Sequence, residues 1–100
     1  MLASSAAMAA PVETPWARVN YIAGGWTAAH VRVQTTATFS NPESCSNSDG
    51  YVVDASLPGA QLFASMLLTA FSTNREVKLV LDGCALERPR VISVTLRGSN

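Results

Sequence analysis

The side chains that could carry out chemistry are few and widely spaced in this chain of 100 residues. His30 is the only histidine. A catalytic histidine needs a nucleophile and an orienting group within reach, and the sequence contains no Gly-x-Ser-x-Gly nucleophile elbow. We therefore expect His30 to be a solvated strand residue and the protein to be neither an enzyme nor dependent on a cofactor. Isolated carboxylates such as Glu43 and Glu76 leave an enzymatic site as an alternative.

Two cysteines lie in turn-rich segments, Cys45 in NPESCSNSDG and Cys84 in LDGCALERPR. Two cysteines without clustered histidines cannot build a closed zinc site, and the Cys-x-x-Cys spacing of redox motifs is missing. A bond closing a loop of about forty residues would stabilise a small domain by about 4 kcal/mol. We predict a structural Cys45–Cys84 disulfide formed in an oxidising compartment, so that the protein is secreted or periplasmic.

A ligand-binding surface is the second candidate site. Trp26 follows Gly24-Gly25, and an aromatic face there could stack on a sugar ring, although the same residue could belong to the core. The ERPR segment, residues 87–90, could clamp a carboxylate through an arginine fork, although such a segment is often a solvated loop. The predicted ligand-binding residues are Trp26, Arg32, Gln34, Arg88 and Arg90.

Charge and composition exclude several classes of partner. Lysine plus arginine and aspartate plus glutamate number seven each, so no basic stripe exists for nucleic acid. No apolar run approaches the roughly 18–20 residues of a membrane span. Asp49 and Asp54 supply too few oxygens for calcium, which takes about six to eight, so no metal site is predicted. We expect no nucleic-acid partner, no membrane span and no bound metal.

The first ten residues, MLASSAAMAA, differ from the rest of the chain. They end in the Ala-x-Ala spacing that a signal peptidase accepts, but the basic region and long apolar stretch of a full signal peptide are missing. We predict that residues 1–10 are a signal-peptide remnant, with a flexible terminus as the alternative. Residues 11–100 are expected to form a single domain.

Periodicity and turn formers predict one helix and five strands. Apolar residues alternate with polar ones in the strand candidates, and the polar segments 40–50 and 83–89 read as loops. Gly24-Gly25 is expected to form a tight reversal. Ser56 is the expected N-cap of the helix and Asn74 its left-handed end. The strands are expected at 16–22, 26–39, 51–54, 76–82 and 90–97, and the helix at about 58–72.

The predicted core combines one helical stripe with the inward faces of the strands. A five-stranded partly open barrel with a helix between its third and fourth strands is the OB-fold plan, although other α+β meanders share this order. Trp16 is expected in the same core. The inward residues are Val31, Val33, Ala37 and Phe39, then Leu62, Phe63, Met66, Leu67, Ala70 and Phe71 of the helix, then Val77, Leu79 and Leu81, and finally Ile92, Val94 and Leu96.

The segments ASMLLTAFSTNREVKLVLDGC and RPRVISVTL resemble a layout found in small secreted bacterial proteins. Residues 60–80 are also similar to the end of the B subunits of subtilase-type AB5 toxins. That family has the OB plan, forms pentamers and binds sialylated glycans. The resemblance implies secretion, an OB-like fold and a homo-oligomer, and it points to glycan binding. The sugar-contacting residues of the family have no match in the amino-terminal half, so none is carried over.

Two functional hypotheses follow. The first is a secreted, non-enzymatic binding module that engages a glycan or another protein. The alternative is a small structural or protein-interaction component of the cell envelope with no small-molecule ligand.

Overall fold

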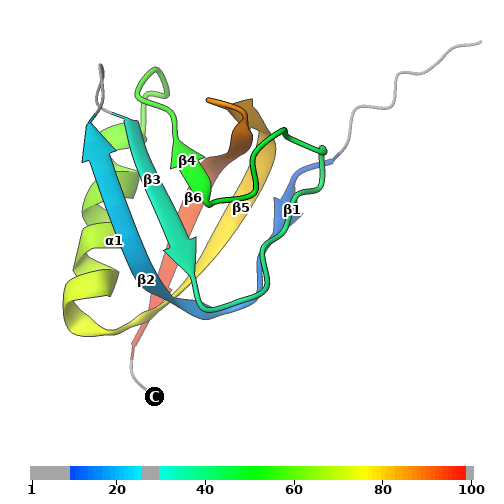
Figure 1. The fold of residues 1–100 in the computed structure, drawn as a ribbon. Helices are drawn as coiled ribbons and strands as arrows, with labels where there is room; N and C mark the ends of the chain where they lie inside the picture. Colours follow the sequence, from blue (N-terminus) through cyan, green and yellow to red (C-terminus); the bar gives the residue numbers. More distant parts are fainter. Residues whose placement is uncertain (1–9, 26–29, 99–100) are drawn as a thin grey trace, which may run out of the picture.

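The computed structural model describes residues 10–25 and 30–98 (Figure 1). The predicted mostly-β class with a single helix between the third and fourth predicted strands is confirmed. The predicted signal remnant lies outside the described residues, apart from Ala10. The elements are β1 (Val12–Glu13), β2 (Ala17–Gly25), β3 (His30–Thr35), β4 (Tyr51–Val53), α1 (Ala60–Thr73), β5 (Glu76–Ala85) and β6 (Arg88–Arg97).

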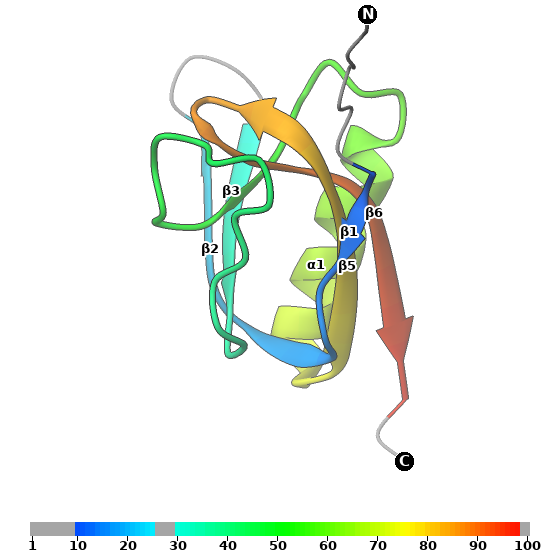
Figure 2. The same ribbon diagram turned by 90° about the vertical axis from the view of Figure 1, so that its right-hand side faces the viewer.

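The strands pair in a ring. Strand β2 is antiparallel to β3, β3 is antiparallel to β4, and β4 meets β6 in parallel where Val52 lies opposite Arg90. Strand β6 is antiparallel to β5, and β5 returns to the start of β2, where Val77 lies opposite Ala17. Figure 2 shows β2 bending at its beginning to reach β5. The bulge that follows Val19 supports this bend, because an extra residue increases the local twist of a strand.

A short first strand was not predicted. Strand β1 pairs with the middle of β5, on the flank of the sheet opposite α1 in Figure 1. Thr14, just after β1, is buried and exchanges two hydrogen bonds with Leu79: its backbone N–H donates to Leu79 O at 2.8 Å, and its Oγ1 accepts from Leu79 N at 2.9 Å. A buried threonine thus satisfies backbone groups that a two-residue strand would leave unpaired.

The predicted reversal at Gly24-Gly25 is wrong in position. Both glycines belong to β2, where they lie opposite Val31 and His30 of β3. The connection therefore falls at residues 26–29, outside the described part of the chain. The second predicted strand, 26–39, is also too long, since β3 ends at Thr35 and the following segment leaves the sheet.

The predicted loop at 83–89 is wrong. Strand β5 continues to Ala85 and β6 begins at Arg88, so only Leu86 and Glu87 form the turn. Both have positive φ, 50° and 66°, as a two-residue hairpin of type I′ requires. Such turns usually contain glycine, asparagine or aspartate, so the sequence carried no signal for this hairpin.

The core lies between α1 and the inner faces of the strands. Seven of the predicted core residues are buried, namely Val33, Leu67, Ala70, Val77, Leu79, Leu81 and Val94. In β6 the register shifts against β5, and Val91 becomes fully buried while the predicted Ile92 is only partly covered. The largest fully buried side chains are Tyr51, Leu67, Leu79, Leu81, Val33, Val52, Val53, Val77, Val91 and Pro89.

The helix buries a narrower stripe than predicted. Leu67 and Ala70 are buried, but Leu62 is 61% exposed and Phe71 is 47% exposed, so their assignment to the core was wrong. At 3.6 residues per turn, Phe71 lies on one side of the stripe centred on Leu67 and Ala70 and Leu62 lies on the other. Asn74 ends the helix with φ of 56°, as predicted.

The predicted N-cap at Ser56 is wrong. Gly59 occupies that position without a side-chain hydrogen bond. Ser56 instead donates its backbone N–H and its hydroxyl to Asp54 Oδ1, each at 3.0 Å. These bonds lower the pKa of Asp54, because they favour its charged form.

Candidate functional site

Strands β2 and β3 place an arginine against a tyrosine on their outer face. Arg32 of β3 lies opposite Ala23 of β2. Ala23 follows Tyr21 by two residues, so the two lie on the same face of β2. Arg32 Nη2 donates a hydrogen bond to Tyr21 Oη at 2.6 Å, and its guanidinium carbon lies 5.0 Å from the centre of the tyrosine ring. The two contacts fix the direction of the guanidinium, because hydrogen bonding and a cation–π contact constrain the same group.

The segment between β3 and β4 brings a carboxylate to this arginine. Arg32 Nη1 donates to Asp49 Oδ2 at 2.6 Å, and Gln34 Nε2 donates to the backbone oxygen of Asp49 at 2.8 Å. The next residue, Gly50, has φ of 138°, and a Cβ atom there would lie 2.9 Å from the backbone oxygen of Val33. Only glycine lets the segment approach β3 this closely.

The β5–β6 hairpin adds a second arginine to the same carboxylate. Arg88 Nε donates to Asp49 Oδ1 at 2.5 Å and Arg88 Nη2 donates to Asp49 Oδ2 at 3.0 Å, a bidentate fork. Arg88 Nη1 donates to Leu86 O at 2.7 Å. We call Arg32, Asp49 and Arg88 the arginine–aspartate cluster. It carries one excess positive charge, since two guanidinium groups share one carboxylate.

The cluster shifts the ionisation of its members. The hydrogen bonds from Arg88, together with the charges of Arg88 and Arg32, hold the pKa of Asp49 below its usual value of 3.8. The bond to Asp49 in turn raises the pKa of Arg88. Asp49 is therefore ionised at neutral pH.

A pocket of about 510 Å³ opens beside the cluster. Its polar lining residues are Tyr21, His30, Arg32 and Arg88. The apolar part includes Val31, Val52 and Leu86. This combination of an apolar surface with a few convergent polar groups is typical of sites for small ligands.

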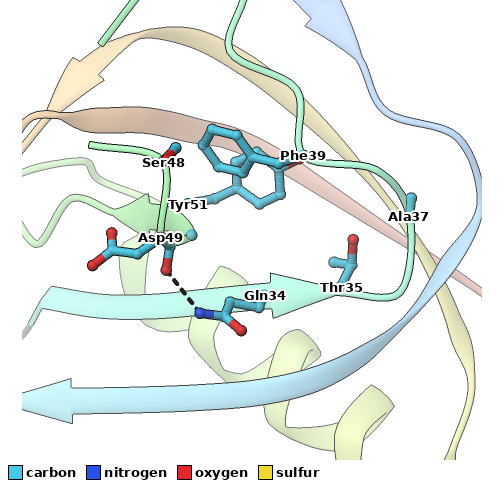
Figure 3. Close-up of a pocket in the computed structure, with 8 residues that line it drawn as sticks. Gln34, Thr35, Ala37, Phe39, Ser48, Asp49 and Tyr51 are labelled. Carbon is cyan, nitrogen blue, oxygen red and sulfur yellow. Dashed lines mark hydrogen bonds between the residues drawn. The ribbon is translucent and has the colours of Figure 1, made fainter. Parts of the chain in front are cut away.

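A smaller pocket of about 210 Å³ lies on the other side of Asp49 (Figure 3). Phe39 stacks on Tyr51 with ring centres 5.0 Å apart, and Tyr51 Oη accepts a hydrogen bond from Ser40 N at 2.9 Å. Burial raises the pKa of Tyr51. In Figure 3 the Asp49 carboxylate points away from Phe39. The larger pocket, which contains both arginines, is therefore the better candidate for binding.

The segment that carries Asp49 is anchored to the β5–β6 hairpin. The predicted Cys45–Cys84 disulfide is present, with Cα atoms 5.8 Å apart. Glu43 Oε2 accepts a hydrogen bond from Gly83 N at 2.7 Å. Asn47 N donates to the backbone oxygen of Glu87 at 2.8 Å. The covalent bond and these two hydrogen bonds hold the segment independently of the arginine–aspartate cluster.

The structure brings together only part of the predicted ligand-binding set. Arg32, Gln34 and Arg88 converge on Asp49, whereas Trp26 lies outside the described residues. Arg90 does not join them, because its Nε donates to the backbone oxygen of Asp82 at 3.0 Å. Its pairing with a carbonyl of β5 takes it out of the predicted clamp.

Tyr21 and Asp49 were not assigned to this site from the sequence. The predicted reversal at Gly24-Gly25 would have put Tyr21 opposite residue 28, so its place beside Arg32 follows only from the observed register of β2 and β3. Asp49 could not be placed there either, because it comes from an irregular segment 17 residues from Arg32 and 39 from Arg88.

His30 differs from its predicted role as a solvated residue. It is half-buried, and its Nδ1 accepts a hydrogen bond from Ala55 N at 3.0 Å. Trp16 is likewise half-buried rather than in the core, and its ring lies against Arg97, whose guanidinium carbon is 4.3 Å from the ring centre. The Ala55 N–H thus takes the place of water at His30, and Arg97 takes the place of core side chains at Trp16.

Comparisons of the chain with models of known protein families, with curated proteins and with solved structures find no match. Among residues 10–25 and 30–98, no group of three or more histidine, cysteine, aspartate or glutamate side chains could hold a metal ion. The helix of the described chain is too short to span a membrane.

Proposed function

We propose that this chain is a secreted or periplasmic, non-enzymatic binding module with an OB-like barrel. The ring of pairing among β2 to β6, with α1 between β4 and β5, supports a five-stranded partly open barrel. The disulfide supports an oxidising compartment.

The pocket beside the arginine–aspartate cluster carries the proposal. OB barrels bind ligands on the face of their second and third strands, flanked by the loops that join strands one to two and four to five. In this chain those elements are β3, β4, the β5–β6 turn and the β2–β3 connection, of which the last lies outside the described residues. They supply Arg32, Val52 and Leu86, with Arg88 just after the turn, and all four line the pocket. The pocket thus lies where an OB barrel is expected to bind.

The proposed ligand is a glycan or a protein segment. Tyr21 offers a rigid aromatic surface beside the two arginines, an arrangement suited to a sugar ring that carries polar or acidic substituents. The resemblance of residues 60–80 to toxin B subunits adds weight to a glycan and to a pentameric assembly.

A glycan-binding screen followed by titration of variants tests the proposal. Arg88→Gln should weaken binding of a glycan found in the screen by about tenfold or more, because it removes a charged group from the pocket. Arg97→Gln is the matched control, since Arg97 pairs with Glu76 at 2.6 Å and does not line this pocket. Thermal unfolding of both variants shows whether they remain folded. A folded Arg88→Gln variant that binds like the wild type would place the site elsewhere.

A protein-interaction role is the second candidate, supported by exposed apolar side chains of α1. Leu62, Leu68 and Phe71 are the large apolar side chains of this helix that are exposed. Exposed apolar surface of this kind is typical of contact sites between proteins. A mass measurement in solution on the wild type and on Leu68→Glu tests this role. A glycan-inert oligomer that dissociates in the variant would favour it over the first proposal, and a monomer would contradict self-association.

A further inference from the structure

The proposed binding pocket already holds an anion of its own. Arg88 grips the Asp49 carboxylate with two parallel hydrogen bonds, and Arg32 donates a third. This is the geometry in which proteins recognise a carboxylate on a ligand. Asp49 therefore occupies the position that the anionic group of a ligand would take.

The Asp49 carboxylate is accessible to solvent, whereas its partners are better covered. The Asp49 side chain is 46% exposed, against 28% for Arg32 and 21% for Arg88. The bidentate fork and the second arginine make this ion pair stronger than an ordinary exposed one, but water can solvate the carboxylate when it leaves, because the side chain is already open to solvent. The arginines remain in place without it, since Arg32 also bonds Tyr21 and Arg88 also bonds Leu86 O.

The main chain does not depend on the carboxylate either. Gln34 holds the backbone oxygen of Asp49, and the Cys45–Cys84 disulfide anchors the segment to the β5–β6 hairpin. The side chain can therefore rotate about its χ1 bond into solvent while the segment stays where it is. Side-chain rotation at an exposed position is fast compared with moving a loop.

We propose that Asp49 is a built-in competitor, and that the ligand is a carboxylate whose charged group replaces Asp49 on Arg32 and Arg88. The proposal rests on the binding function proposed above. No covalent step is involved: one ion pair is exchanged for another, and Asp49 turns into solvent. The rest of the ligand lies in the 510 Å³ pocket against Tyr21, Val52 and Leu86.

Competition lowers the apparent affinity for a carboxylate ligand. A protein whose binding-competent form is only partly populated binds more weakly by that fraction. Removal of the Asp49 charge makes the competent form dominant, and it raises the excess charge of the cluster from one to two. A neutral ligand that does not need the arginine fork gains nothing from this change.

The experiment compares Asp49→Asn with the wild type, using galacturonate and galactose as probes in titrations followed by NMR. The two sugars share the same ring, and only galacturonate carries a carboxylate. Asp49→Asn should bind galacturonate several-fold to about tenfold more tightly than the wild type does, with galactose binding unchanged. Glu13→Gln is the matched control, because it removes the same charge from β1, where Glu13 faces Lys78 at 3.5 Å. It should change neither affinity.

The possible outcomes distinguish failure of the competitor proposal from failure of the proposed binding function. Tighter galacturonate binding by Asp49→Asn alone supports both. Binding of galactose by the wild type, with no gain for galacturonate in the variant, overturns the competitor and leaves the binding module standing. Weaker galacturonate binding in Asp49→Asn, with an unchanged melting temperature, also overturns the competitor, since Asp49 would then contact the ligand. Failure of both proteins to bind either sugar at this pocket counts against both proposals.

Discussion

Replacing Cys45 and Cys84 together by alanine should lower the free energy of unfolding by about 4 kcal/mol. The disulfide joins residues 39 apart, so it closes a loop of about forty residues in the unfolded chain. In the chain-entropy expression this loop corresponds to about 13 cal/mol/K, which is about 4 kcal/mol at 25 °C. For a domain of this size the loss is a large share of a total of about 5–15 kcal/mol.

The folded state should change little in this variant. Glu43 and Asn47 still bond the β5–β6 hairpin through Gly83 N and the backbone oxygen of Glu87. The loss therefore arises mainly in the unfolded chain, which gains freedom when the loop opens. Urea unfolding followed by circular dichroism measures both effects, because the midpoint reports stability and the slope reports the surface exposed on unfolding.

The wild type treated with a reductant is the control for the double variant. Reduced wild type and the Cys45→Ala, Cys84→Ala variant should unfold at similar urea concentrations, and both should show a steeper slope than the oxidised protein. A double variant within about 1 kcal/mol of the oxidised wild type, at equal slope, would refute the reasoning, because an unlinked chain would then gain no freedom.

Two further predictions concern the core and the charged cluster. Leu67→Ala should lower the free energy of unfolding in urea by about 2–5 kcal/mol, because Leu67 is fully buried. Leu68→Ala, at a side chain that is 57% exposed, should lower it by less than about 1 kcal/mol. Similar losses in the two variants would contradict the described helix face. The lowered pKa of Asp49 means that its stabilising contribution is present above its usual value of 3.8 and disappears as the pH falls through the lower, folded-state value. The difference in melting temperature between the wild type and Asp49→Asn should therefore be constant from pH 7 to about 5 and decrease below about pH 4. A difference that stays constant down to pH 2 would show that Asp49 is not stabilised by its arginine partners.

Much of the fold could be predicted where local pattern and burial agree. In β5 the alternation of Val77, Leu79 and Leu81 predicted the inward face, and all three are buried. The pattern failed where long-range contacts decide the structure. Leu86 and Glu87 adopt positive φ without glycine or asparagine, in a hairpin that a disulfide and several hydrogen bonds hold in place.

The site was predictable only in part for the same reason. Arg32 and Gln34 lie two residues apart on one strand, so their common face follows from the period of the strand. Asp49 comes from an irregular segment whose path depends on Gly50 fitting against Val33, a contact that no local pattern specifies.

The docking of β1 on β5 has a consequence for the order of events during synthesis. The partners of Thr14 in β5 lie 65 residues further along the chain, so β1 leaves the ribosome long before it can pair. The thiol of Cys45 likewise has no partner until Cys84, 39 residues further along the chain, has been synthesised. Contacts so distant in sequence slow folding, because their loops must close before the contacts form. The nascent chain must therefore carry an unpaired strand and a free thiol until the β5–β6 hairpin has emerged, and both are open to other chains during that interval.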